Sequence, residues 1–269
     1  MEVTFLFAPK RYVKPILCGL LFILNFGCDN GVEIDKGEES KNYKEYGSVI
    51  TEGLIAYYPF DGNAEDYSGH KLHGNENGVE ATVGRFNQPN GALSFDGVDD
   101  FIEIPQFSDI NNSSGTICFW ARIPSGIHNN KEAAVISRRD SVGEGYILSI
   151  HGSKDYWFDY KTVFGSESGA YMYTNYWEDN KYLFIGVTFS KGIDTTSTVF
   201  TYYFQGHPTI EFKNTAIDQN FSFNNSGMPL FIGKSLIPRY SYLQGELDDL
   251  LIYNRALSGD EILELFKWE

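Results

Sequence analysis

The stretch that decides the fold is Gly245–Phe266, which reads GELDDLLIYNRALSGDEILELF. Its first half is an apolar, strand-forming run headed by two adjacent acids, Asp248 and Asp249. Neighbouring residues of a strand point to opposite faces, so Asp248 shares a face with Leu250 and Asp249 shares the other with Leu251. Either way, one carboxylate points toward packed side chains. A buried carboxylate needs a counter-charge, a set of hydrogen-bond donors or a metal ion.

The second half of this stretch predicts the one helix of the chain. Ser258 followed by Glu261 is the pattern of a capping box, and Ile262, Leu265 and Phe266 form one apolar stripe. We expect this short C-terminal helix to cover the rim of the sheets.

Upstream, short runs of β-branched and aromatic residues alternate with clusters of Gly, Asn, Asp and Ser. No long helical pattern interrupts them, and the alternation of strand and helix that marks a parallel sheet is absent from the sequence. The pattern predicts an all-β fold, an antiparallel β-sandwich. The clearest runs are GLIAYYPF, GALSF, DFIEI, TICFWARI, AVISRR, YILSIH, YLFIGVTF, VFTYYF, PLFIG and LDDLLIYN.

Two of these runs show which face is internal. In TICFWARI and YLFIGVTF one set of alternate residues is aliphatic or phenyl and is expected to fill the core between two sheets. That set is Ile117, Phe119, Ala121, Ile123, Leu183, Ile185, Val187 and Phe189. The opposite faces carry Trp120, Arg122, Tyr182 and Phe184, and are less clearly internal.

The first 27 residues have the layout of a secretory signal. Lys10, Arg11 and Lys14 precede a short, mostly apolar run that ends at Gly27-Cys28. A small residue directly before a cysteine is typical of a bacterial lipoprotein, so Cys28 is the expected lipidation site, with plain secretion as the alternative. We predict a signal peptide at 1–27, a flexible tether at 28–52 and one domain at 53–269. The expected location is the bacterial outer membrane or cell surface, with membrane contact only through the lipid anchor.

The formal net charge is −15. Such a chain repels phosphate backbones, so nucleic acid is not an expected partner. With Cys18 in the signal and Cys28 acylated, Cys118 is left alone and no disulfide within the domain can form.

Five segments, taken in order, resemble the laminin-G-like, concanavalin A-like jelly-roll domains of bacterial surface proteins. The resemblance spans Gly53 to Phe266 and implies two antiparallel sheets, often with a structural calcium ion at their rim. That family includes carbohydrate-binding domains, adhesion modules and domains appended to enzymes. The segments are GLIAYYPFDGNAEDYSGHKLHG, GALSFDGVDDFIEIP, GTICFWARI, MPLFIGKS and GELDDLLIYNRALSGDEILELF.

The resemblance also implies that the first and last strands pair antiparallel, which would bring Asp61 near Asp248 and Asp249. The loop GNAEDYSG adds Asn63 and Asp66. Oxygen ligands in a glycine-rich loop suit Ca²⁺, and these five residues are the predicted calcium ligands. The alternative is that the acids cap turns and accept backbone N–H groups.

A second acidic group, in SFDGVDDFIEIP, contains Asp96, Asp99, Asp100 and Glu103. Turn chemistry between two hairpin strands explains it, with metal or sugar contact as alternatives.

Catalysis is not expected. Some glycoside hydrolases of this general fold carry an E-x-D-x-E or E-x-D-x-x-E strand motif. Glu246 and Asp248 begin that pattern, but Leu250 and Leu251 stand where the second Glu would fall. Hydrolysis of a glycosidic bond by the usual route needs two opposed carboxyl groups, so the motif is incomplete.

The aromatic loops favour binding instead. DYWFDY and YMYTNYWEDN place Trp157, Tyr173, Tyr176 and Trp177 among polar residues, as sugar-stacking sites require, although packing beneath long loops would also explain them. We therefore expect a surface-anchored, non-catalytic carbohydrate-binding domain with a glycan partner. The alternative is an envelope adhesion or assembly module that recognises a protein partner.

Overall fold

The structure is a computed structural model that describes residues 50–107, 114–124, 132–139, 145–151, 156–161, 167–172, 180–191, 198–214 and 228–268. By contacts the chain divides into Met1–Glu45 and Tyr46–Glu269, and all described residues belong to the second unit. Cys28 and the predicted tether up to Val49 lie outside them.

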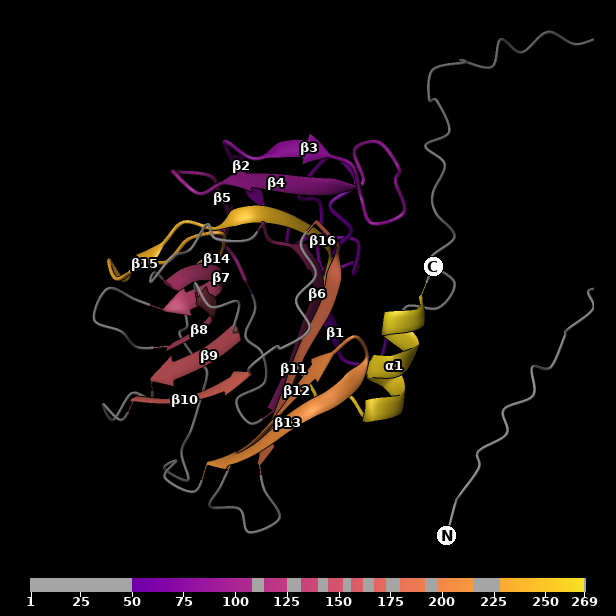
Figure 1. Cartoon of the computed structure of the whole chain (residues 1–269), viewed down its shortest axis with the longest axis vertical. Helices are drawn as coiled ribbons and strands as arrows, with labels where there is room; N and C mark the ends of the chain where they lie inside the picture. Colours follow the sequence, from indigo (N-terminus) through magenta and orange to yellow (C-terminus); the bar gives the residue numbers. More distant parts are fainter. Residues whose placement is uncertain are drawn as a thin grey trace, which may run out of the picture. The chain divides into compact units, whose positions relative to one another are not determined.

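The second unit is built from two eight-stranded, mainly antiparallel sheets (Figure 1). Sheet A contains, in spatial order, β13 (His207–Asn214), β12 (Thr198–Phe204), β11 (Leu183–Lys191), β6 (Ser114–Arg122), β16 (Gln244–Tyr253), β4 (Ala92–Asp96) and β3 (Glu80–Thr82), with β1 (Leu54–Tyr58) also paired to β16. Sheet B contains β10 (Glu167–Met172), β9 (Tyr156–Lys161), β8 (Gly145–His151), β7 (Glu132–Arg139), β14 (Leu230–Ile232), β5 (Phe101–Ile104) and β2 (Asn75–Asn77), with β15 (Tyr240–Ser241) parallel to β7. The all-β sandwich predicted from the sequence is confirmed.

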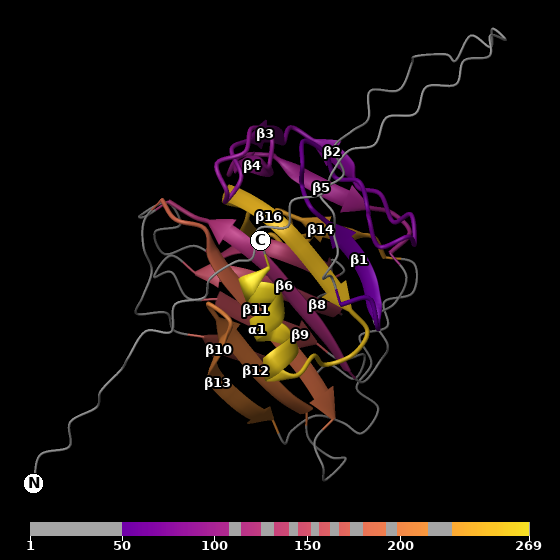
Figure 2. The ribbon, with the colours of Figure 1, turned by 90° about the vertical axis from the view of Figure 1, so that its right-hand side faces the viewer.

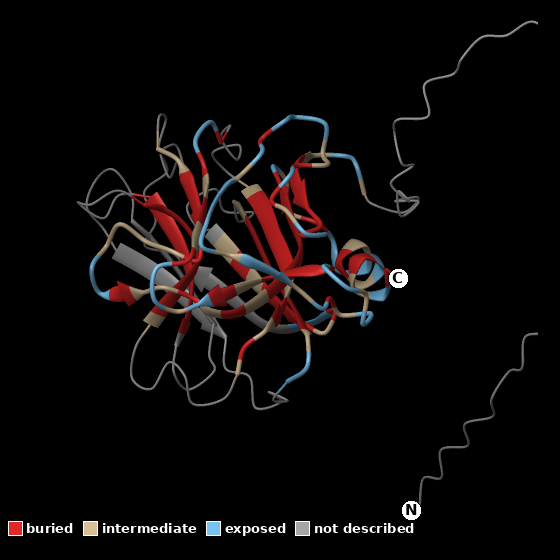
Figure 3. Cartoon of the chain, turned by 90° about the horizontal axis from the view of Figure 1, so that it is seen from above, coloured by how far each residue is buried: buried red, intermediate tan, exposed pale blue. Residues whose placement is uncertain are grey.

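The core lies between the two sheets, and Figure 3 shows the buried residues concentrated in the facing strands. The alternating sets predicted on β6 and β11, from Ile117 to Ile123 and from Leu183 to Phe189, all belong to this core and are at most 2% exposed. Their outward-facing neighbours form a second apolar layer on the other side of sheet A, which includes Cys118, Trp120 and Phe184. Sheet A is therefore buried on both faces.

Helix α1 (Gly259–Lys267) makes that second layer possible. Its capping box is as predicted: the Ser258 hydroxyl accepts from the Glu261 N–H at 3.3 Å, and the Glu261 carboxylate accepts from the Ser258 N–H at 2.7 Å. Ile262 and Leu265 are buried against the outer face of sheet A, where Figure 2 shows the helix lying over β6 and β11. The helix thus covers a sheet face, and the expectation that it covers the rim is wrong. Nowhere in the described ranges is a helix long and apolar enough to cross a membrane.

The first and last strands pair antiparallel, as the resemblance implies. Tyr58 is opposite Leu250, and Leu54 is opposite Tyr253. Strand β16 lies between β6 on one side and β4 and β1 on the other, so it is a central strand of sheet A.

Candidate functional site

The two adjacent acids of β16 face the same side of sheet A. Strict alternation fails because Asp249 has a positive φ of 45° and the register with β6 shifts between Asp248 and Leu251. Such a bulge adds one residue to the strand, so Leu247 and Leu250 both face the core while the two acids between them do not. The expectation of one acid on each face is therefore wrong, and both carboxylates, not one, are buried among packed side chains.

The counter-charge that these acids require is Arg85. Its Nη1 donates to Asp248 Oδ1 at 2.9 Å and also to Asp249 Oδ2, and its backbone N–H donates to Asp248 Oδ2 at 2.9 Å. The Tyr57 hydroxyl donates to the other oxygen of Asp249 at 2.5 Å. The Arg85 side chain is 3% exposed and the two acids are 2% exposed as side chains, so this is a buried ion-pair network.

A short closed loop between β3 and β4 presents Arg85. Gly84 donates to the carbonyl of Gln88 at 3.0 Å, Asn87 donates to the carbonyl of Gly84 at 2.9 Å, and Phe86 donates to the side chain of Gln88 at 3.0 Å. These bonds fix the loop without regular secondary structure. The loop is found in the sequence as TVGRFNQPNG, a run of turn-forming residues around one arginine and one phenylalanine.

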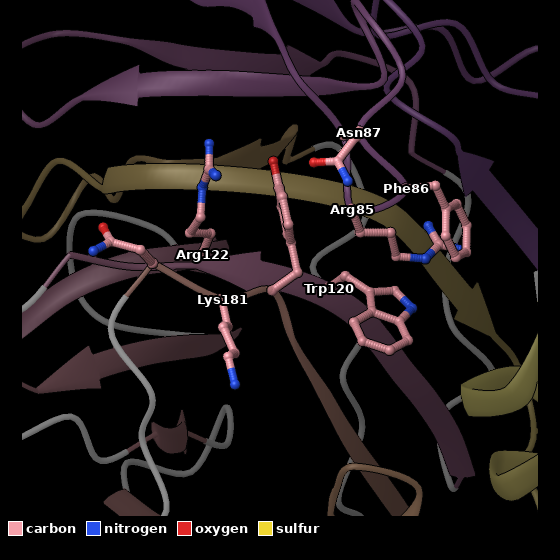
Figure 4. A pocket seen from close by; sticks show the side chains of 9 residues that line it. Arg85, Phe86, Asn87, Trp120, Arg122 and Lys181 are labelled. Carbon is pink, nitrogen blue, oxygen red and sulfur yellow. The ribbon is translucent and has the colours of Figure 1, made fainter.

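The same loop forms one wall of a hollow of about 370 Å³ on the outer face of sheet A (Figure 4). Arg85 lies against aromatic rings there, with its guanidinium carbon 4.3 Å from the centre of the Phe86 ring and 5.1 Å from Trp120. Trp120 in turn stacks on Phe266 of α1 at 5.7 Å and meets Phe184 edge-on at 5.4 Å. The residues that line the hollow are Gly84, Arg85, Phe86, Asn87, Trp120, Arg122, Asn180, Lys181 and Tyr182.

The opposite wall is held by a second polar network. Arg122 Nε donates to Glu246 at 2.6 Å, and the Tyr182 hydroxyl lies 2.7 Å from the same carboxylate and 2.9 Å from the carbonyl of Val83. Burial, followed by the bond to Glu246, raises the pKa of the Tyr182 hydroxyl above its usual range, so it stays protonated. The bond to Glu246 likewise raises the pKa of Arg122. Near neutral pH, Arg122 is therefore charged and the Tyr182 hydroxyl is neutral.

The predicted calcium ligands have other partners. Asp66 is 7% exposed and its two oxygens accept from the N–H groups of Tyr57, Ser68 and Leu72 at 2.9–3.0 Å and from the Ser68 hydroxyl at 2.9 Å. Asn63 accepts from the N–H of Glu65 at 2.9 Å, and Asp61 is exposed. The alternative reading of Asp66, as an acceptor for loop N–H groups, is the one observed.

This donor set does not fit a shared cation, because the Asp66 oxygens are already used and a guanidinium sits on Asp248 and Asp249. Within the described ranges, one group of three metal-capable side chains has its ligand atoms within 4.8 Å of one another. It is Asp96, Asp99 and Asp100. The predicted set is therefore not brought together as calcium ligands, although calcium binding itself stays a prediction.

The second acidic group has the expected turn chemistry, but the strands on either side of it do not form the expected hairpin. β4 belongs to sheet A and β5 to sheet B, so the turn carries the chain from one sheet to the other. Asp96 Oδ1 accepts from the N–H groups of Val98 at 2.7 Å and Asp99 at 3.3 Å, which lowers the pKa of Asp96. Asp100 accepts from the Asp96 N–H at 2.8 Å, but burial raises its pKa.

Of the predicted sugar-binding aromatics, Tyr173, Tyr176 and Trp177 lie outside the described residues. Trp157 belongs to β9, of which the backbone is described. Sequence reasoning did not find the hollow. The sequence gives one indication of it: Trp120, Arg122 and Tyr182 alternate with the predicted core residues and so lie on the opposite face of their strands.

Comparison with known proteins bears on the family and the fold of this chain. Residues 96–263 match the Laminin_G_3 family, described as the Concanavalin A-like lectin/glucanases superfamily. No protein of curated function matches the chain in sequence.

Three similar solved structures are binding domains of bacterial toxins, and the chain spans about half the length of each. The binding domain of Paraclostridial Mosquitocidal Protein 1 is 18% identical with a TM-score of 0.63, covering 81% of this chain and 52% of that one. The receptor-binding domain of botulinum neurotoxin C/D mosaic serotype is 14% identical with a TM-score of 0.62, covering 81% and 52%. The ligand-binding domain of botulinum neurotoxin serotype D, solved with N-acetylneuraminic acid, is 14% identical with a TM-score of 0.60, covering 81% and 51%. At these identities the likeness shows the fold.

Proposed function

Because the chain belongs to the Concanavalin A-like lectin/glucanases superfamily, we propose that it is a surface-tethered, non-catalytic carbohydrate-binding domain. The observation that carries this proposal is the hollow on sheet A. It combines aromatic rings, which suit the apolar faces of pyranose rings, with amide and cationic groups that suit their hydroxyls.

The exposed ring at the hollow is Phe86. It is 44% exposed, and where burial is described along the chain no other aromatic side chain is classed as exposed. Trp120 lies deeper and is held by Phe184 and Phe266, so it forms a fixed floor. An exposed aromatic ring beside a tightly packed one can bind the flat face of a ligand. Here Phe86 would make the contact and Trp120 would form the base of the site.

The arrangement of carboxylates supports binding without catalysis. Glu246 is bonded to Arg122 and Tyr182, and Asp248 is bonded to Arg85, so both acids of the incomplete hydrolase motif serve as structural counter-charges. An acid held by a guanidinium is poorly suited to deliver a proton to a leaving group.

The loop aromatics Trp157, Tyr173, Tyr176 and Trp177 remain a second proposed contact surface for the glycan. A structural calcium ion also remains part of the proposal, although Asp66 and Asp248 do not suit it as ligands. Anchoring is proposed at Cys28, and the test is mass spectrometry of the membrane-extracted protein. A Cys28→Ser variant should lose the acyl mass and appear in the soluble fraction.

A glycan array on the full chain tests the binding proposal. Phe86→Ala should weaken binding of the best glycan by about tenfold, as expected when an interface aromatic is truncated. Val98→Ala is the matched control, because Val98 is a 69% exposed apolar residue that does not line the hollow. Trp157→Ala and Trp177→Ala test the loop surface in the same way.

The absence of any bound glycan would overturn the proposal. A stoichiometric protein partner recovered without sugar dependence would instead favour the adhesion module. That alternative is in keeping with the toxin domains named above, two of which are described as binding or receptor-binding domains.

A further inference from the structure

The guanidinium of Arg85 has one used edge and one unused edge. Nη1 carries two N–H groups, and these are taken by Asp248 and Asp249. Nε and Nη2 are buried and have no hydrogen-bond partner within the described part of the chain. An unpaired buried donor costs about 1–3 kcal/mol, so three such N–H groups on one side chain mark a place where an acceptor belongs.

The unused edge belongs to a residue that lines the hollow, and the side chains that line the hollow include donors and no carboxylate. Arg85, Arg122 and Lys181 are cationic, Asn87 and Asn180 are neutral amides, and no acid lines the hollow. The acids that pair with Arg85 and Arg122 are Asp248, Asp249 and Glu246, and none of the three lines the hollow. In a chain of net charge −15, this wall is a local exception.

The geometry of the unused edge selects the kind of anion. Nε and Nη2 of arginine present two parallel N–H groups, a fork that matches the two oxygens of a planar carboxylate. Resting on the carbohydrate-binding function proposed above, we infer that the glycan bound here carries a carboxylate, as uronic and sialic acids do, and that Arg85 receives it. The paired acids on Nη1 hold the guanidinium in place for this contact.

Because Nε and Nη2 are buried, a ligand reaches them only if a neighbouring side chain moves, and Phe86 is the neighbour that we propose moves. Its ring lies 4.3 Å from the Arg85 guanidinium carbon, and Figure 4 shows it beside the end of that side chain. The ring is 44% exposed, whereas Trp120 packs against Phe184 and Phe266, so movement of Phe86 would disturb the packing less than movement of Trp120. The carboxylate would then accept from Nε and Nη2, and the Phe86 ring would lie against the sugar.

Calorimetric titration of the full chain with matched ligands tests this inference. The probes are an oligogalacturonate, its carboxyl-reduced counterpart, and a sulfated neutral oligosaccharide of the same length. Reduction of the carboxyl groups should weaken binding by about tenfold or more, the worth of a charge-assisted hydrogen bond. Equal binding of the reduced and acidic ligands, or preference for the sulfated one, would overturn the inference and leave glycan binding intact. If none of the three ligands binds and the glycan array is also empty, the proposed function itself is overturned.

Arg85→Lys isolates the fork. A lysine keeps a positive charge for Asp248 and Asp249 but offers no pair of parallel donors, so this variant should bind the acidic and reduced ligands alike. Arg255→Lys is the control, since Arg255 pairs with Glu261 beside α1 and does not line the hollow. It should keep the full preference for the acidic ligand. If Arg85→Lys does not fold, the comparison of acidic and reduced ligands on the unaltered chain still decides the matter.

Discussion

Arg85 and Asp248 are joined by two hydrogen bonds of 2.9 Å, one from the backbone N–H and one from the guanidinium, across 163 residues of sequence. This contact fixes the loop between β3 and β4 to the central strand of sheet A. Together with the bond to Asp249, it gives a buried cation two buried anions, and it leaves the other edge of the guanidinium for a ligand.

Removal of Arg85 should therefore be costly. Arg85→Met removes the guanidinium that Asp248 and Asp249 share, and we expect a loss of about 3–5 kcal/mol in the free energy of unfolding. Urea denaturation measures it. Arg122→Met is the matched control, because the Arg122 side chain is 29% exposed and its pairing with Glu246 should be worth about 1 kcal/mol or less. Equal losses in the two variants would show that the Arg85 network is not stabilising in the way its burial indicates.

Asp66 should act as an acceptor for backbone N–H groups and not as a metal ligand. Asp66→Asn keeps one oxygen but removes the charge that receives three N–H groups, so stability should fall by about 1–3 kcal/mol. The fall should be the same in calcium and in EDTA, as measured by thermal melting.

Calcium titration into EDTA-treated protein tests for an ion as such. An ion bound only to the folded chain stabilises it by about 2.7 kcal/mol when free calcium is a hundredfold above its dissociation constant. If the unaltered protein shows a calcium-dependent rise in Tm and Asp66→Asn abolishes it, Asp66 is a calcium ligand. The prediction from the sequence would then be right, and the assignment of Asp66 as an acceptor for N–H groups alone would be wrong.

Glu261 should make the docking of α1 depend on pH. The hydrogen bond from Arg255, together with bonds from Ser258, lowers the pKa of Glu261 from 4.5 to about 2. A folded-state pKa below the ordinary value stabilises the folded protein at pH above 4.5, and this contribution is lost as the pH falls toward 2. Because both partners are partly exposed, we expect it to be about 1 kcal/mol.

Glu261→Gln checks this, since glutamine preserves the capping box but carries no charge. The difference in Tm between the two proteins should be largest above about pH 5 and should become small as the pH falls to about 2, because Glu261 is then increasingly protonated in the folded protein. A constant difference across this range would mean that the charge of Glu261 contributes nothing.

Substitution of two glycines with positive φ distinguishes the cost of backbone strain from the cost of steric overlap. Gly206 has φ of 74°, and a Cβ there would lie 2.7 Å from the Phe266 ring of α1, whereas Gly69 has φ of 93° with no atom within 4 Å. Gly69→Ala should cost about 1–2 kcal/mol from the left-handed backbone alone. Gly206→Ala should cost measurably more and should loosen α1, which hydrogen exchange of the helix amides would report. Similar stability in both variants would show that Phe266 yields without cost.

The fold was predictable because its signals are local. The alternation in TICFWARI identified Ile117 and Phe119 as core residues, and Ser258 with Glu261 marked the start of α1. These patterns depend only on the pleat of a strand and on the unpaired N–H groups of a helix end.

The candidate site was not predictable in the same way, because it depends on contacts between distant segments. Alternation could not foresee the bulge at Asp249, since a single residue with positive φ reverses the face of its neighbour. The sequence did show that these acids need a partner, but one arginine in the loop at Gly84–Gln88 looks like any other surface charge. Its role follows only from the pairing of β4 with β16, which brings that loop over the two acids.

The place of β16 in the sheet has a consequence for the order of folding. This strand holds β1, β4 and β6 together, yet it comes last of all the strands when the chain is synthesised. Neither β1 nor β4 can be joined to β6 until residues 244–253 are available, because β16 lies between them. Loss of β16 would therefore divide sheet A in its middle, with β6 on one side and β1 and β4 on the other, and would not merely shorten one edge.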